Sequence, residues 1–216
     1  MKIAAIIPAF NEEKTIGATI QAAKGSSKIA EIIVVDDGST DNTFLVANNL
    51  GVKVLKLGKN YGKAQAMKKG VEQTDAPVLI FIDADLIGLS SQQLDILIDP
   101  ILKDEADMII GKIDRRNKKQ ETPKIYKNQH YLSGTRVLKS SFWNSVPERF
   151  KKSFYIESAM TYIAKKKGMI VKDMFLENVK HVVKEQKYGW SMGFLRRLKM
   201  FIQLGVIFIM LRIQRF

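Results

Sequence analysis

The chain has no cysteine, only two histidines and no long uncharged apolar run. The absence of cysteine excludes disulfide scaffolds, thiolate zinc sites and thiol nucleophiles, and it fits a reducing compartment, so we expect a cytoplasmic protein. No segment reaches the roughly 18–20 uncharged apolar residues that a membrane span requires. The apolar residues 3–10 include Pro8 and run straight into polar residues, which favours a first core strand over a signal peptide.

Positive charge is distributed unevenly along the 216 residues, whose formal net charge is +13. Residues 1–111 hold 11 Lys and Arg against 15 Asp and Glu, a net −4, whereas residues 112–216 hold 24 against 7, a net +17. A uniformly basic nucleic-acid binder would not show this division, so we expect no nucleic-acid partner. The second half favours phosphates or an acidic membrane leaflet, or else carries solvated lysines on helix faces.

The first half alternates short apolar runs with helical patterns. This alternation is typical of an α/β fold whose mostly parallel sheet is covered by helices on both faces. The predicted strands are residues 3–7, 32–35, 52–57, 78–82 and 108–110. The predicted helices are residues 13–24, 42–50, 63–74 and 92–103. Thr40 or Asp41 is expected to cap the second helix, and Ser90 or Ser91 the fourth.

The second half has a different pattern, with a polar and basic loop at residues 113–128. A short strand and turn near 133–138, a helix near 154–167 and a strand near 169–176 are expected to follow. The sequence therefore divides into an α/β half at 1–111, a second half of the same domain at 112–188, and a C-terminal helix at 189–216.

Polar residues follow each of the four early predicted strands, at 11–13, 36–39, 60–63 and 83–85. In open parallel sheets, ligands bind beyond the carboxyl ends of the strands. Asp83 and Asp85 follow a fully apolar run, and two carboxylates there repel each other unless a cation or hydrogen-bond donors neutralise them. Such oxygen ligands favour Mg²⁺ or Mn²⁺, either of which could bridge a nucleotide diphosphate.

Residues 36–41 combine a carboxylate pair, a turn glycine and a helix cap. The segment is either only a turn with an N-cap, or a site where Asp37 accepts a hydrogen bond from a base N–H.

Residues 7–13, 34–41, 60–63 and 83–85, in this order, resemble the family 2 glycosyltransferases. The resemblance implies a Rossmann-like GT-A fold and a nucleotide-sugar donor, most often a UDP-sugar. Within the family, the sequence is similar to members directed at polyprenyl phosphates or other lipids. It implies that Asp37 holds the base, that Asp83 contacts the nucleotide and that Asp85 binds the metal. The other implied donor-binding residues are Pro8, Ala9, Phe10, Glu12, Asn60, Lys63 and Ala84.

The second half matches the family at three further places. Residues 133–136 correspond to a small-residue turn beside the donor sugar and acceptor, which implies roles for Ser133, Gly134 and Arg136. Glu157 lies where many inverting members place a catalytic carboxylate, although Ser158 replaces the second acid of the usual Glu-Asp pair. Glu157 is therefore a catalytic residue together with Asp85, or it contacts the sugar or acceptor instead, or it lies on a helix surface.

His181 resembles the late histidine that completes the metal site in several GT-A enzymes, and the alternative is a role in a polar network.

The C-terminal residues 190–216 combine basic and aromatic residues with an uncharged dozen at 200–211. Twelve helical residues extend about 18 Å, too short for a hydrocarbon core of about 30 Å. The composition favours an amphipathic helix on an anionic membrane surface, which would place the protein peripherally on the inner face of a membrane. Alternatively, this helix packs on its own domain or forms a homodimer.

These features together predict a metal-dependent glycosyltransferase that moves a sugar from a nucleotide-sugar to an acceptor, and a lipid-linked acceptor fits the basic C-terminal segment. A non-catalytic nucleotide-sugar-binding protein stays open as an alternative. A sugar-phosphate nucleotidyltransferase is disfavoured because residues 8–11 are not a Gly-rich basic loop. A phosphoacceptor receiver domain would leave residues 11–13 and the basic second half unexplained.

Overall fold

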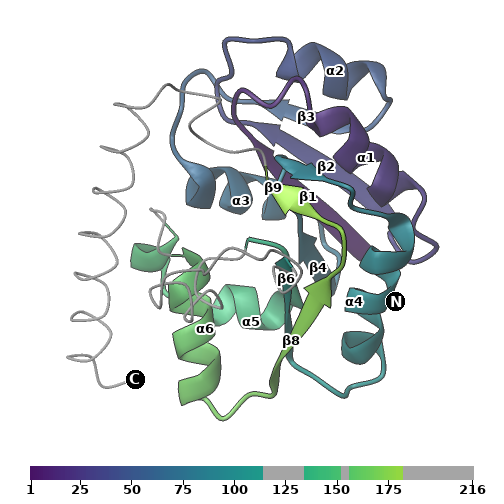
Figure 1. The fold of residues 1–216 in the computed structure, drawn as a ribbon. Coiled ribbons are helices and arrows are strands. Elements are labelled where there is room, and N and C mark those ends of the chain that lie inside the picture. Colours follow the sequence, from purple (N-terminus) through teal and green to yellow (C-terminus); the bar gives the residue numbers. More distant parts are fainter. Residues whose placement is uncertain (114–133, 152–155, 182–216) are drawn as a thin grey trace, which may run out of the picture.

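The computed structural model describes residues 1–113, 134–151 and 156–181. A seven-stranded sheet of order β3-β2-β1-β4-β7-β6-β8 forms its centre (Figure 1). Its strands are β1 (Ile3–Ala9), β2 (Glu31–Asp36), β3 (Lys53–Lys56), β4 (Val78–Phe81), β6 (Met108–Ile113), β7 (Arg136–Lys139) and β8 (Val171–Leu176). Only β7 runs antiparallel to its neighbours β4 and β6 among these strands, which confirms the mostly parallel sheet of the GT-A prediction.

Helices cover both faces of the sheet and make an α/β/α sandwich (Figure 1). One face carries α1 (Ile16–Lys24), α2 (Thr43–Asn49) and α4 (Ser91–Leu102). The other face carries α3 (Lys63–Val71), α5 (Ser140–Ser145) and α6 (Ile156–Lys166). Because water reaches neither face, the central strands are continuous apolar runs rather than alternating ones.

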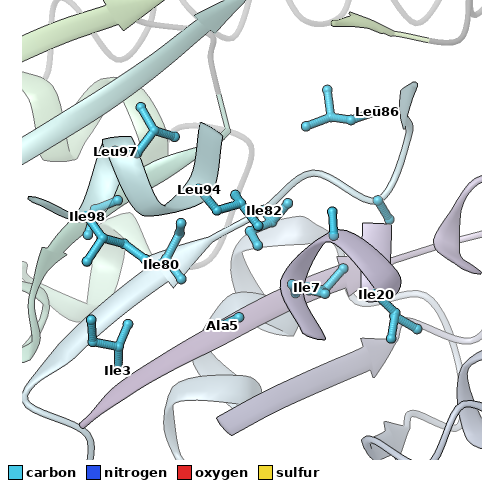
Figure 2. Packing of buried hydrophobic residues seen from close by; sticks show 14 of the residues in the cluster. Ile3, Ala5, Ile7, Ile20, Ile80, Ile82, Leu86, Leu94, Leu97 and Ile98 are labelled. Carbon is cyan, nitrogen blue, oxygen red and sulfur yellow. The ribbon is translucent and has the colours of Figure 1, made fainter. Parts of the chain in front are cut away.

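Successive residues of the central strands enter two separate cores. Figure 2 shows Ile3, Ala5 and Ile7 of β1 on the same side as the α4 residues Leu94 and Leu97. The intervening Ala4 and Ile6 belong to the core beneath α3, α5 and α6. This alternation follows from the two-residue period of a strand. It decides to which face of the sheet each side chain of a strand points.

Every helix and strand predicted for residues 1–111 is present, with ends shifted by up to three residues. Ser90 caps α4 in a reciprocal capping box with Gln93, as one of the two predicted candidates. The N-cap of α2 is Asn42 rather than Thr40 or Asp41, although the Asp41 carboxylate accepts a hydrogen bond from the Thr43 N–H at 3.0 Å.

Four short elements were not predicted. They are α5, a 3-10 turn at Glu148–Phe150, and a two-stranded antiparallel sheet of β5 (Leu86–Ile87) and β9 (Lys180–His181). A two-residue strand shows no hydrophobic period, so the sequence carries no signal for it.

The predicted loop at 113–128 lies almost wholly outside the described residues, and Ser133 and the C-terminal helix at 189–216 lie wholly outside them. The division of the first 188 residues into two halves stays a prediction, and β6 crosses its boundary within one sheet. Within the described ranges, no helix is long and apolar enough to cross a membrane.

Candidate functional site

The polar segments that follow β1, β2 and β4 meet at one edge of the sheet. Parallel pairing places Ala9 opposite Asp36, and the Asp37 N–H donates to the Ala9 carbonyl at 2.8 Å. On the other side of β1, the Ile82 N–H donates to the Ile6 carbonyl at 3.1 Å. The structure therefore brings the predicted clusters at residues 11–13, 36–39 and 83–85 together at the carboxyl edge.

The turn after β1 is locked to the turn after β2 by side-chain hydrogen bonds. The Asn11 N–H donates to Ser39 Oγ at 2.9 Å, and Asn11 Oδ1 accepts from the Thr40 N–H at 2.8 Å. Asn11 has a left-handed φ of 55°, a conformation that asparagine tolerates better than most residues. The Glu12 N–H donates to Thr43 Oγ1 at 2.7 Å. These bonds hold rigid the segment that contains the predicted nucleoside-binding residues Pro8, Ala9, Phe10 and Glu12.

Asp37 fixes the loop between β3 and α3. Its two carboxylate oxygens accept the N–H groups of Tyr61 and Gly62, both at 2.8 Å. Burial raises the pKa of Asp37, and the two backbone hydrogen bonds offset part of that rise. Each oxygen keeps a second lone pair, so the predicted bond to a base N–H remains compatible with this geometry.

Gly38 allows this loop to approach. Its φ is 74°, and a Cβ there would lie 2.5 Å from the backbone carbon of Lys59. Any other residue at position 38 would therefore push away the loop that carries Asn60 and leads to Lys63.

Asp83, Asp85 and His181 form a group whose ligand atoms all lie within 4.8 Å of one another. His181 Nδ1 is 3.0 Å from Asp85 Oδ1. The pairing of β5 with β9 places Leu86 opposite His181, which is how a residue 96 positions away reaches Asp85. Two carboxylates and one imidazole are a donor set that fits Mn²⁺ or Mg²⁺.

The pKa of His181 is raised within this group. Burial lowers it, but the hydrogen bond and charge of Asp85 and the charge of Asp83 outweigh burial. The negative charges of the two carboxylates thus favour the protonated form of the imidazole.

Lys63 lies between two carboxylates of the site. Its Nζ donates to Asp83 Oδ1 and, at 2.5 Å, to Glu157 Oε1. Glu157 lies in the first turn of α6 and is only 7% exposed, so the alternative of a solvated helix surface is wrong. Burial lowers the pKa of Lys63, but the two carboxylates outweigh burial and leave that pKa raised.

Gly134 leaves room for the Lys63–Asp83 ion pair. In the antiparallel pairing of β4 with β7, Phe81 lies opposite Arg136, so the chain two residues further on brings Asp83 to Gly134. A Cβ on Gly134 would overlap both Lys63 Nζ and Asp83 Oδ1. The predicted sugar-side residue Gly134 therefore does lie at the site.

Arg136 lies behind the site rather than in its opening. Its side chain has no exposed surface, and Nη1 donates to Thr161 Oγ1 at 2.7 Å. Burial lowers the pKa of Arg136 to about 10, against the opposing charges of Glu157 and Asp83. The structure thus does not support a direct contact of Arg136 with sugar or acceptor, and it gives Arg136 the position of a buried counter-charge.

Sequence reasoning missed Thr161, which accepts from Arg136 and donates to the Glu157 carbonyl at 3.0 Å. The four-residue spacing between Glu157 and Thr161 on one helix was the available signal.

Comparisons with known proteins agree with this geometry. Residues 4–177 match the sequence model of "Glycosyl transferase family 2". The 4,4'-diaponeurosporenoate glycosyltransferase of Staphylococcus aureus (strain MRSA252) is 37% identical over 99 residues, which are 44% of this chain and 26% of that protein. The same enzyme of strain USA300 matches with the same identity and coverage. The chain therefore spans, by these matches, about a quarter of the length of the curated relatives.

Solved structures show the same fold. Glucosyl-3-phosphoglycerate synthase from Mycobacterium tuberculosis, in complex with Mn²⁺, UDP and phosphoglyceric acid, matches with a TM-score of 0.72 and 22% identity. The match covers 84% of this chain and 71% of that one. The same synthase with Mg²⁺ and UDP matches with a TM-score of 0.71 and 22% identity, over 84% of this chain and 72% of that one. Since the family model matches well over half of its residues, the chain belongs to glycosyl transferase family 2.

Proposed function

We propose that this protein is a metal-dependent glycosyltransferase that moves a sugar from a nucleotide-sugar, a UDP-sugar, to an acceptor. The observation that carries the proposal is the convergence of Asp83, Asp85 and His181 at the carboxyl edge of the sheet. The structural neighbours support the choice of ligands, because their complexes contain Mn²⁺ or Mg²⁺ together with UDP.

The nucleotide end of the donor is assigned to the first half of the chain and to His181. Asp37 would accept the base N–H, beside the rigid turn that holds Pro8, Ala9, Phe10 and Glu12. Asp83, Ala84, Asp85 and His181 would hold the cation and the diphosphate. Bound there, a divalent cation would neutralise the donor diphosphate and the nucleoside diphosphate that leaves.

The sugar end is assigned to the segment around Gly134 and to Glu157. Glu157 is bonded through Lys63 to Asp83, so a sugar attached to a diphosphate at Asp83 would lie close to its carboxylate. We assign Glu157 as the catalytic carboxylate that accepts the proton of the attacking acceptor. Lys63 and the buried Arg136 hold this carboxylate near the reacting centre.

We further propose that the acceptor is lipid-linked and that residues 190–216 hold the protein on an anionic bilayer. The support is the basic and aromatic composition of that segment. Sedimentation with vesicles that contain phosphatidylglycerol tests this. We expect binding that falls when Arg196, Arg197 and Lys199 are replaced by Ala. Equal sedimentation with neutral vesicles, or none, would contradict the membrane assignment and favour a small anionic acceptor or a dimer.

Incubation with labelled UDP-sugars, Mn²⁺ and a polyprenyl phosphate tests the activity itself. We expect release of UDP or formation of a glycosylated product, both lost in Asp85→Asn. Donor binding without hydrolysis or transfer would indicate a nucleotide-sugar-binding protein. Pyrophosphate-dependent formation of a sugar phosphate would indicate a nucleotidyltransferase.

A further inference from the structure

The ammonium group of Lys63 is bonded to the same carboxylate that is proposed to serve the divalent cation. Lys63 Nζ donates to Asp83, and Asp83 is one of the three candidate metal ligands. The second partner of the ammonium is Glu157, the proposed catalytic carboxylate. One lysine thus neutralises both acids in the protein without ligands.

Four other segments of the chain, at Asp37, Asp83, Gly134 and Glu157, hold Lys63 in this position. Lys63 is the first residue of α3, and the loop that precedes it is held by the Asp37 carboxylate through Tyr61 and Gly62. The ion pair fills the space that Gly134 leaves by having no Cβ. Its side chain is 27% exposed and those of Asp83 and Glu157 are 11% and 9% exposed, so the three charges interact with little screening by solvent.

The charges around Asp83 nearly balance without any ligand. Among the described residues other than His181, Asp83, Asp85 and Glu157 contribute three negative charges, and Lys63 and the buried Arg136 contribute two positive ones. A divalent cation that enters alone would make the group positive and lie beside the Lys63 ammonium. A nucleoside diphosphate that enters with the cation brings negative charge for both, so the two ligands favour each other.

We propose that Lys63 makes binding of the divalent cation depend on the nucleoside diphosphate. Lys63 occupies Asp83 and Glu157 in the free protein, and the cation binds tightly only together with the diphosphate. This inference rests on the proposed function. Lys63 acts here as a positioning residue, and by linkage the cation must strengthen diphosphate binding by the same factor.

Titration calorimetry with Mn²⁺ alone, and with UDP at saturating Mn²⁺, tests the role of Lys63. Lys63→Gln removes the charge and keeps a polar side chain of similar length. We expect it to bind Mn²⁺ alone about tenfold more tightly and UDP about tenfold more weakly, within the usual range of coupling between two sites. A merely structural defect would weaken both. Lys63→Arg, which keeps the charge, should stay closer to the wild type in both titrations.

Lys68→Gln is the matched control, because Lys68 lies on the same helix and pairs with Glu148 at 2.6 Å among exposed side chains. Both affinities should stay at wild-type values in this variant. A folded Lys63→Gln protein whose affinity for Mn²⁺ alone is unchanged or weaker would overturn the role of Lys63.

If Lys63→Gln does not fold, Glu157→Gln gives a second test. This variant leaves the ammonium to Asp83 alone, so Mn²⁺ alone should bind more weakly than to the wild type, and tighter binding would overturn the inference. Absence of Mn²⁺-dependent UDP binding in the wild type would instead overturn the proposed function. The two failures are therefore distinguishable.

Discussion

Gly134 is a residue of the site where a single methyl group should disturb the Lys63–Asp83 ion pair directly. Its missing Cβ leaves the space in which Lys63 and Asp83 meet. Gly134→Ala should displace that ion pair, lower the free energy of unfolding by about 1–3 kcal/mol and weaken nucleotide binding. Urea denaturation and UDP titration measure the two effects.

Gly58→Ala is the control for this prediction, because a Cβ at Gly58 would meet no atom within 4 Å. A Gly134→Ala protein with the stability and UDP affinity of Gly58→Ala would show that the ion pair is not seated against residue 134.

Glu157 is the residue whose chemistry the proposed mechanism needs most. Glu157→Gln keeps the shape of the side chain but cannot accept a proton as a carboxylate does. We expect sugar transfer to fall by about 10²–10⁴-fold, the usual contribution of a positioned general base. Steady-state kinetics measure this, with the exposed Glu148→Gln as control. Full turnover in Glu157→Gln would remove the base assignment.

The start of helix α4 contacts the segment that leads to the candidate metal ligand His181. Its capping box joins Ser90 to Gln93, and Gln93 Nε2 also donates to the Glu177 carbonyl at 2.8 Å, just before the strand that carries His181. Ser90→Ala should lower the free energy of unfolding by about 1 kcal/mol, since it removes one partner of the box.

Ser91→Ala is the comparison. Its free energy of unfolding should change by no more than about 0.5 kcal/mol, because the Ser91 hydroxyl donates to the exposed side chain of the neighbouring Gln92. Chemical denaturation of both variants measures the difference. Equal losses would contradict the capping role of Ser90.

The elements with a clear period could be predicted from the sequence, and those that depend on distant pairing could not. The apolar run that contains β4 lies between Pro77 and Asp83, and Ser90 precedes its helix with the right partner at Gln93. By contrast, β9 has two residues, and only its pairing with β5 brings His181 to Asp85. The role of His181 could therefore be suggested by resemblance, but its contact could not be derived.

The site shows the same limit. Asp83 and Asp85 are adjacent in sequence to a buried strand, so their position could be predicted. The bridge from Lys63 to Glu157 joins residues 94 positions apart, and no local pattern records it. Arg136 was expected at the acceptor because it follows a small-residue turn. Its place in β7, between two core strands, buries it instead.

The whole molecule is organised by one sheet that both halves of the chain build. The first half supplies β1 to β4 and the acidic strand ends, and β7 and β8 of the second half extend the same sheet. The antiparallel β7 brings Gly134 and Arg136 beside the end of β4, and α6 brings Glu157 from the helical layer that it shares with α3. The residues proposed for the donor and those proposed for the sugar therefore meet at one edge, as the transfer of a sugar between two substrates would require.

Calorimetric titration of the purified protein with UDP, with and without Mn²⁺, tests the central claim most directly. We expect UDP to bind with Mn²⁺ and to lose that binding after EDTA treatment. Asp85→Asn should abolish the Mn²⁺-dependent part, whereas Asp75→Asn, at a carboxylate 90% exposed and paired with Lys2, should not change it. Absence of UDP binding to the folded protein, or equal binding in Asp85→Asn, would contradict the account.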